Sequence, residues 1–231
     1  MADYDRAIGF DPSFALAYYN RGTAWRNRNE FDRALADLNE SIRLDPNYAP
    51  AYGNRARLYR DEGDVDRAFD DFAEALRLNP DGSRDYYARG KLYFDKHDYE
   101  FALADFNAAI EHDPAYAQAF NLSCLTKAIL NRADAGLFDC EQALKLDSAN
   151  AAFVDSRGFC HLRLGELEPA IADYNEALAI NPKLPDSLFG RGLAKRKQGD
   201  LEGGRVDIEA AKAIDAGIAG KFASYGIENA D

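Results

Sequence analysis

The sequence has few cysteines, few histidines and no excess of positive charge. Three Cys among 231 residues are too few for a disulfide framework. The three His occur without an HExxH or CxxC spacing, which gives a metal site little support. The 40 acidic residues outnumber the 28 basic ones and leave a net charge of −12, which disfavours sequence-independent binding to nucleic acid.

Long apolar runs and catalytic motifs are also missing. No run approaches the roughly 20 apolar residues of a membrane-spanning helix, and the first residues carry charges where a secretory signal needs an apolar stretch. Gly203 and Gly204 lack the flanking Lys-Ser/Thr of a phosphate-binding loop, and no G-x-S-x-G nucleophile motif occurs. We therefore predict a soluble protein that is not an enzyme, with no catalytic residue, no cofactor and no metal.

The sequence does contain a 34-residue period, marked by a proline that recurs in register. In units counted from three residues after each proline, large side chains recur at places 4 and 24 and small ones at places 8 and 20. Places 4, 8 and 11 share one face of a first helix, and places 20, 24, 27 and 28 share one face of a second. The prolines are Pro12, Pro46, Pro80, Pro114 and Pro182. Each unit thus predicts two antiparallel helices, which bury both faces only by stacking on neighbouring units.

This pattern resembles the tetratricopeptide repeat (TPR), in the form found in bacterial TPR proteins. The resemblance implies an all-α fold, a right-handed superhelical solenoid of antiparallel helix pairs. The predicted repeats are residues 15–48, 49–82, 83–116, 117–150, 151–184 and 185–218, followed by a capping helix and tail at 219–231. The fourth and sixth repeats depart most from the pattern; in the fourth, Ser148 replaces the proline and Cys140 the large residue at place 24. We expect the fourth repeat to be the least stable.

Residues 1–14 have the pattern of the second helix of a leading repeat whose first helix is absent. A helix that exposes a face meant for a partner is an odd natural start, so we expect a truncated fragment whose native N-terminus is missing. The compartment is therefore left open between cytoplasm and periplasm.

Aspartate fills place 23 in every repeat, and arginine fills place 7 in five of six. The aspartates are Asp3, Asp37, Asp71, Asp105, Asp139, Asp173 and Asp207, and the arginines are Arg21, Arg55, Arg89, Arg157 and Arg191. Stacked repeats lie roughly 10 Å apart, too far for neighbouring carboxylates to share one ion. We predict a structural ladder of Arg–Asp pairs. The sequence does not decide whether each pair stays within one repeat or crosses to the next.

The resemblance to TPR proteins also implies that the first helices line a concave groove, with places 2, 5, 6, 9, 12 and 13 pointing into it. At these places eight basic residues face four acidic ones, which gives +4 on a chain of −12. The basic residues are Arg26, Arg57, Arg60, Arg84, Lys91, Arg163, Arg196 and Lys197, and the acidic ones are Asp61, Asp95, Asp155 and Asp186. We predict a basic groove inside an acidic shell.

Apolar side chains fall at groove places as well. They are Tyr19, Tyr87, Phe94, Leu122, Leu125, Ile129, Phe159, Leu162, Phe189 and Leu193. We predict a non-catalytic scaffold whose groove binds a peptide or helix of another protein, with the basic residues favouring an acidic segment. The alternative is a homo-oligomer that self-associates through its N-terminal face or its apolar groove. Some TPR domains hold a C-terminal carboxylate with Lys and Asn, but only Asn54 and the basic Arg84 match those places here, which argues against such a clamp.

Cys124 and Cys140 occupy places 8 and 24 of the fourth repeat, where a small residue meets a large one across the helix seam. We expect the two sulfurs to be in contact. A disulfide and a pair of buried thiols both satisfy this spacing, and the compartment decides between them. Cys160, at a different place in the next repeat, is predicted to be a free thiol.

Overall fold

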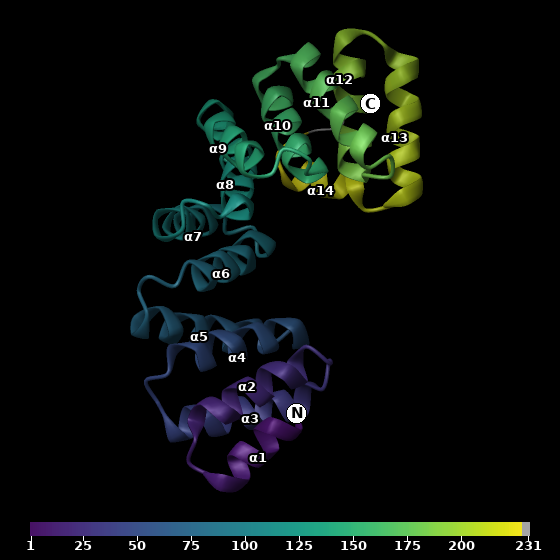
Figure 1. The fold of residues 1–231 in the computed structure, drawn as a ribbon. Coiled ribbons are helices and arrows are strands. Elements are labelled where there is room, and N and C mark those ends of the chain that lie inside the picture. The colour runs from purple at the N-terminus through teal and green to yellow at the C-terminus, as the bar shows by residue number, and fades with distance from the viewer. Residues whose placement is uncertain (228–231) are drawn as a thin grey trace. The chain divides into compact units, whose positions relative to one another are not determined.

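The computed structural model describes residues 1–227, and this part of the chain forms fourteen α-helices and no strand (Figure 1). The helices are α1 (Ala2–Phe10), α2 (Ala15–Arg26), α3 (Phe31–Leu44), α4 (Ala49–Glu62), α5 (Val65–Leu78), α6 (Ser83–Asp95), α7 (Tyr99–His112), α8 (Ala117–Ile129), α9 (Ala133–Leu146), α10 (Ala151–Leu164), α11 (Leu167–Ile180), α12 (Pro185–Gln198), α13 (Leu201–Ile214) and α14 (Ile218–Ser224). None of these helices has both the length and the hydrophobicity needed to span a membrane. Residues 228–231 of the predicted tail lie outside the described part.

Five of the 34-residue units form a packed helix pair: α2 with α3, α4 with α5, α8 with α9, α10 with α11 and α12 with α13. The turn between the two helices of every unit has one residue with a positive φ, always at place 15. These residues are Asn29, Gly63, His97, Asn131, Gly165 and Gly199. Glycine adopts this left-handed backbone at no steric cost, and asparagine tolerates it better than most residues. The period of the sequence therefore sets the turn as well as the helix faces.

The second helix of each repeat ends at an Asp or Asn with an extended backbone. Asp45 has φ −135° and ψ 91°, as expected for a residue that precedes a proline and is excluded from the helical region. Asp147 and Asp215 adopt similar angles, with φ −148° and −135°, although Ser148 and Ala216 follow them. The helix thus ends at this place even where the proline is absent.

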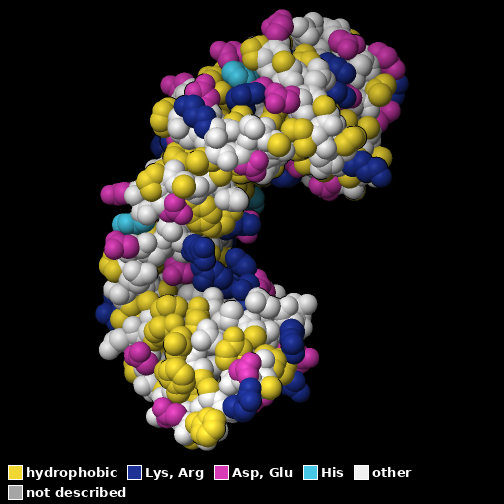
Figure 2. Space-filling model, viewed as in Figure 1, with side chains coloured by type: hydrophobic (Ala, Val, Ile, Leu, Met, Phe, Trp, Pro, Cys, Tyr) yellow, Lys and Arg dark blue, Asp and Glu magenta, His cyan; other side chains and the backbone are white. Residues whose placement is uncertain are grey.

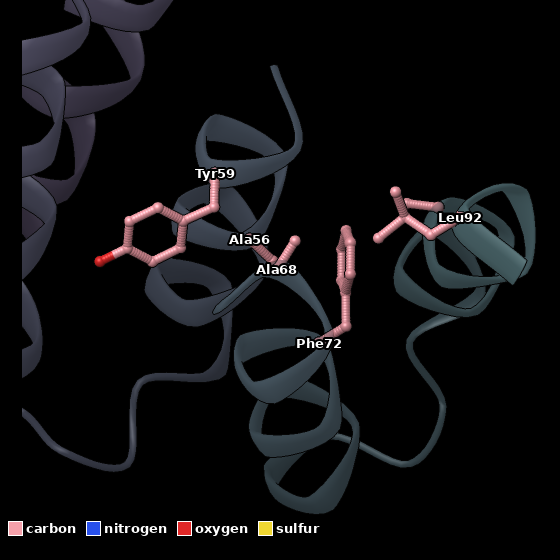
Figure 3. Close-up of a cluster of buried hydrophobic side chains, with 6 residues drawn as sticks. Ala56, Tyr59, Ala68, Phe72 and Leu92 are labelled. Carbon is pink, nitrogen blue, oxygen red and sulfur yellow. The ribbon is translucent and has the colours of Figure 1, made fainter. Parts of the chain in front are cut away.

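The core runs from one repeat into the next through side chains of the second helices. A Cβ placed on Gly22 would lie only 3.1 Å from Leu38 Cγ, so the small residue lets the second helix approach closely. In the second repeat Ala56 has this role, and the fully buried Phe72 packs beside it. Phe72 reaches from α5 towards Leu92 on α6, the first helix of the next repeat (Figure 3). The second repeat and the first helix of the third therefore share a core, as neighbouring repeats of a helical solenoid do.

The chain divides into two compact units, Met1–Lys96 and His97–Asp231. The N-terminal unit contains α1 to α6, and the C-terminal unit contains α7 to α14. The division falls inside the third repeat, between its two helices.

Candidate interaction surfaces of the repeats

Arginine at place 7 and aspartate at place 23 of the same repeat form a bidentate ion pair across the helix seam. Arg55 donates through Nε and Nη2 to the two carboxylate oxygens of Asp71, both at 2.7 Å. The same geometry joins Arg21 to Asp37, Arg157 to Asp173 and Arg191 to Asp207. Since the four aspartate side chains are at most 9% exposed, the hydrogen bonds are largely shielded from water.

Arg55 and Arg191 also reach the preceding repeat. Arg55 Nη1 donates to Asn39 at 2.7 Å, and Arg191 Nη1 donates to Asn175 at 2.8 Å. Each of these arginines therefore joins the two helices of its own repeat and also ties that repeat to its neighbour, which the sequence left open.

In the C-terminal unit the aspartate ladder has an additional basic residue at place 11. Lys127 donates to Asp139 at 2.5 Å, where Ser123 stands in place of the arginine and donates to the same carboxylate at 2.6 Å. Lys195 lies 2.8 Å from Asp207. Burial opposes ionisation of Asp207, but hydrogen bonds from its arginine and lysine partners outweigh burial and lower the pKa of its carboxyl. The N-terminal unit has aromatic residues at this place, such as Tyr59.

The first helices of the N-terminal unit carry a cluster of basic side chains. Arg26 of α2 and Arg60 of α4 both bond to Asp61, through Arg26 Nη2 at 2.6 Å and Arg60 Nη2 at 2.8 Å. Arg57 Nη2 bonds to Asp85 at 2.7 Å and to the carbonyl oxygen of Arg84 at 3.1 Å. Figure 2 shows Lys and Arg side chains gathered in the middle of the view, beside α6. Three of the predicted groove arginines are thus brought together, but they are fixed by carboxylates of the chain itself.

Two other predicted groove residues remain available. Within residues 1–227 the side chains of Arg84 and Lys91, both on α6, have no ion-pair or hydrogen-bond partner, and Arg84 is exposed. Asn54 donates instead to Thr23 Oγ1 at 2.8 Å, so it joins α4 to α2. Tyr87 and Phe94, also on α6, are half-buried. We name the face formed by Arg26, Arg57, Arg60, Arg84 and Lys91 the basic face.

The corresponding face of the C-terminal unit is covered by the chain's own C-terminal helix α14. The ring of Phe222 lies 4.7 Å from that of Phe189 on α12 and 5.8 Å from that of Phe159 on α10. The Tyr225 ring lies 5.8 Å from that of Phe159. Arg163 of α10 donates to the carbonyl oxygens of Tyr225 and Gly226, at 3.2 and 3.1 Å.

This cover corrects part of the groove prediction. Phe159, Leu162 and Phe189 are at most 3% exposed, so they are not open to an external partner in this state. Arg163 is occupied by α14 and by Asn131. The Arg196 stem packs towards α13, because a Cβ placed on Gly204 would lie 2.4 Å from Arg196 Cγ. Leu122 and Leu125 on α8 are half-buried, whereas Ile129 is buried. The predicted capping helix therefore forms, but it lies on the first helices α10 and α12.

A titratable carboxyl lies under the start of this cover. Asp155 of α10 is half-buried and accepts a hydrogen bond from Ser187 Oγ, while Lys221 of α14 pairs with the neighbouring Asp186. Burial and the Asp186 charge raise the pKa of Asp155 to about 7, against the opposing effects of the Ser187 hydrogen bond and the Lys221 charge. Sequence reasoning placed Asp155 in the groove, but nothing in the sequence distinguishes its environment from that of Asp61.

Three cysteines meet in the core of the C-terminal unit. Cys124 and Cys140 form a disulfide whose Cα atoms lie 5.3 Å apart, and Cys160 is a buried free cysteine. Cys160 Sγ lies 3.3 Å from Cys124 Sγ, and burial raises the pKa of the Cys160 thiol to about 12. The three sulfurs lie within 4.8 Å of one another, so the reduced protein would have three soft ligand atoms in one place. Sequence reasoning did not place Cys160 beside the other two cysteines. Its sulfur lies against Gly136, where an added Cβ would be only 3.2 Å from Cys160 Sγ.

Comparison with known proteins identifies the repeats. The tetratricopeptide repeat family matches residues 15–48, 49–81 and 83–116, and a further TPR repeat model matches residues 161–199. A search of curated protein sequences returned no match.

Solved structures share the fold. The crystal structure of YrrB, described as a TPR protein with an unusual peptide-binding site, is 23% identical with a TM-score of 0.70, over 80% of this chain and 95% of that one. PilF of Pseudomonas aeruginosa is 18% identical with a TM-score of 0.73, over 94% and 99% of the two chains. MamA from Desulfovibrio magneticus RS-1 is 23% identical with a TM-score of 0.66, over 73% and 95%. The chain therefore belongs to the tetratricopeptide repeat family, whose helical solenoids are scaffolds for protein–protein interaction.

Proposed function

We propose that the N-terminal unit binds an acidic segment of a partner protein on its basic face. The observation that supports this most directly is that the Arg84 and Lys91 side chains have no partner within residues 1–227. The other three cations of this face share Asp61 and Asp85, so cations remain in excess. An acidic peptide would neutralise this excess, and such charge complementarity gives specificity and fast association.

The arginines that are already paired have a second role in this proposal. Burial opposes ionisation of Asp61, but hydrogen bonds from Arg26 and Arg60 outweigh it and lower the pKa of its carboxyl. The pairs therefore hold these guanidinium groups in fixed positions, which reduces the side-chain entropy lost when a ligand binds. The half-buried Tyr87 and Phe94 on the same helix offer apolar contact beside the charges. The description of YrrB as a peptide-binding TPR protein supports a peptide as the class of ligand.

The test is binding of the full chain to an array of synthetic peptides of increasing acidic content. We expect retention to rise with acidic content and to fall with NaCl, since exposed charges are screened. Arg84→Glu combined with Lys91→Glu should weaken retention about tenfold or more. The matched control, Arg43→Glu with Arg77→Glu, makes the same charge change at exposed residues of the second helices α3 and α5. Equal losses in both variants would contradict the proposal, because the net charge alone would then explain binding.

The same variants distinguish partner binding from self-association. Light scattering over a dilution series should give a mass that does not depend on concentration. A mass that rises with concentration, and that Arg84→Glu with Lys91→Glu lowers, would assign the basic face to an interface between copies of this chain.

A further inference from the structure

The C-terminal helix α14 contacts the C-terminal unit through one stripe of side chains. Ile218, Phe222 and Tyr225 are at most 8% exposed, and their spacing of four and three residues places them on one side of a helix. Ile227, which follows the helix, is 8% exposed. Between them, Gly220, Lys221, Ala223 and Ser224 are exposed. This is the pattern of an amphipathic helix seated in a groove.

The surface beneath α14 also makes polar contacts with the α14 segment. Arg163 donates to two main-chain carbonyls at the end of the segment, and Lys221 pairs with Asp186 near its beginning. Just beyond, Arg163 and Lys197 line a shallow pocket together with Leu162, Gly226 and Ile227. The groove therefore offers a bound segment three kinds of group in order. The carboxylate of Asp186 comes first, the rings of Phe159 and Phe189 follow, and the cations Arg163 and Lys197 lie at the end.

α14 has little stability of its own. It spans seven residues, and helices of fewer than about 12 residues are marginal in water. Its N-terminus has no side-chain cap, and Gly217 and Gly220 lie at or near that end. Its position therefore depends on the groove contacts, and short terminal elements held in this way open more readily than the core.

We propose that the face of α10 and α12 is a second binding site, which accepts an amphipathic helix of a partner protein, and that α14 occupies this site as an intramolecular ligand. The sequence of α14 and the residues after it defines the chemistry of that partner: a basic residue followed at once by Phe, Tyr three residues later, and an aliphatic residue two beyond that. The partner helix replaces α14, and the same groove contacts are then made in trans. This site is separate from the basic face of the N-terminal unit, so either proposal can fail without the other.

The test uses the full chain and a fluorescein-labelled synthetic peptide of residues 215–227. Lys221→Glu replaces the cation that pairs with Asp186 by a like charge, which should release α14 without altering the core because Lys221 is exposed. Fluorescence anisotropy should then show peptide affinity at least about tenfold higher than for the unaltered protein, since a ligand binds weakly to a site that is mostly occupied. The matched control is Lys212→Glu on α13, the same charge change at an exposed residue, which should leave affinity unchanged.

The chemistry of the ligand is tested separately. A peptide with Phe222→Ala and Tyr225→Ala should not bind. A helix of unrelated sequence that carries the Lys-Phe-x-x-Tyr-x-Ile pattern should bind to the Lys221→Glu protein, and the same helix with its aromatic residues one position closer should not. Failure of the grafted pattern would overturn the assignment of the partner.

Hydrogen exchange shows whether α14 was released. Full-chain Phe222→Ala with Tyr225→Ala is the second variant, for use if Lys221→Glu leaves the amides of residues 218–227 protected. A variant that frees these amides, stays helical and binds the peptide no better than the unaltered protein would overturn the proposal. Protection of residues 218–227 equal to that of α12 in both variants would overturn it as well, because α14 would then be a fixed part of the fold.

Discussion

The two units are built from the same repeat but differ in the side chains on their first helices and in whether these are covered. In the N-terminal unit the first-helix face carries cations, two of which have no partner within residues 1–227. In the C-terminal unit this face carries Phe159 and Phe189 and is covered by α14. The difference follows from the side chains, because a charged face is stable in water whereas an aromatic one is not. One repeat architecture therefore carries a charged first-helix face in one unit and an aromatic face covered by a terminal helix in the other.

The seam between the helices differs in a parallel way. In the N-terminal unit the place-11 aromatic packs beside arginines, with the Arg67 guanidinium 4.3 Å from the centre of the Tyr59 ring. In the C-terminal unit Lys127 and Lys195 take this place and bind the ladder aspartate. The first arrangement adds cation–π contact to the seam, and the second adds an ion pair. The aspartate therefore compensates more buried positive charge in the C-terminal unit.

The largest expected effect tests this difference in charge. Asp207→Ala leaves Arg191 and Lys195 facing each other, and we expect it to destabilise the C-terminal unit by about 3 kcal/mol or more. Asp71→Ala leaves only Arg55, without a second cation, so we expect a loss about 1 kcal/mol smaller; both arginines keep their bonds to Asn39 and Asn175. Urea denaturation of both variants measures the losses. Adding Lys195→Met to Asp207→Ala should reduce the loss of unfolding free energy to that of Asp71→Ala. If the larger loss remains, the extra cation is not its cause.

Reduction of the disulfide is the next test, because the N-terminal unit has no equivalent cross-link. A bridge closing a sequence separation of 16 residues contributes about 3 kcal/mol in the loop-entropy treatment. Its reduction should therefore speed hydrogen exchange in α8 and α9 and leave α4 and α5 unchanged. Alkylation without reductant, followed by mass spectrometry, should label Cys160 alone, and only after denaturation, since this thiol is buried. Labelling of all three cysteines would mean that the bridge is absent and that the fourth repeat relies on packing alone.

The sequence predicts the repeats well because their signal is periodic. The spacing of Ala34, Leu38 and Ser41 alone defines the buried face of a helix, and the helix-ending Asp-Pro recurs at the same interval. The positions of α14 and Cys160 depend on contacts between residues far apart in the sequence, such as Cys124 with Cys160 and Arg163 with Tyr225. No period links such residues, so the sequence did not indicate that α14 lies on α10 and α12.

Tyr174 provides a smaller test of packing in the C-terminal unit. A Cβ on Gly190 would lie 2.3 Å from Tyr174 Cζ, so Gly190→Ala forces the fully buried ring to move. We expect a loss of about 1–3 kcal/mol, as in other overpacked cores. In the N-terminal unit Gly9→Ala meets nothing within 4 Å and should gain about 0.5 kcal/mol from helix propensity. Thermal denaturation of the two variants measures both changes, and a neutral Gly190→Ala would show that Tyr174 has room to adjust.

The smallest expected effect is a pH dependence of α14, which the open face of the N-terminal unit should lack. The half-buried Asp155, beside Lys221 of α14, has a pKa raised from 3.8 to about 7, mainly by burial. When α14 leaves, water reaches Asp155 and its pKa falls, so the seated form binds the additional proton between these two values. The stability of the seated form therefore decreases as pH rises from about 4 to about 7 and is constant above that range. Hydrogen exchange of residues 218–227, corrected for the intrinsic rate, should be about tenfold faster relative to α12 at pH 7.5 than at pH 5.5. Asp155→Asn removes the titrating group and should abolish this slope, whereas a slope that persists in Asp155→Asn would place the pH-sensitive group elsewhere.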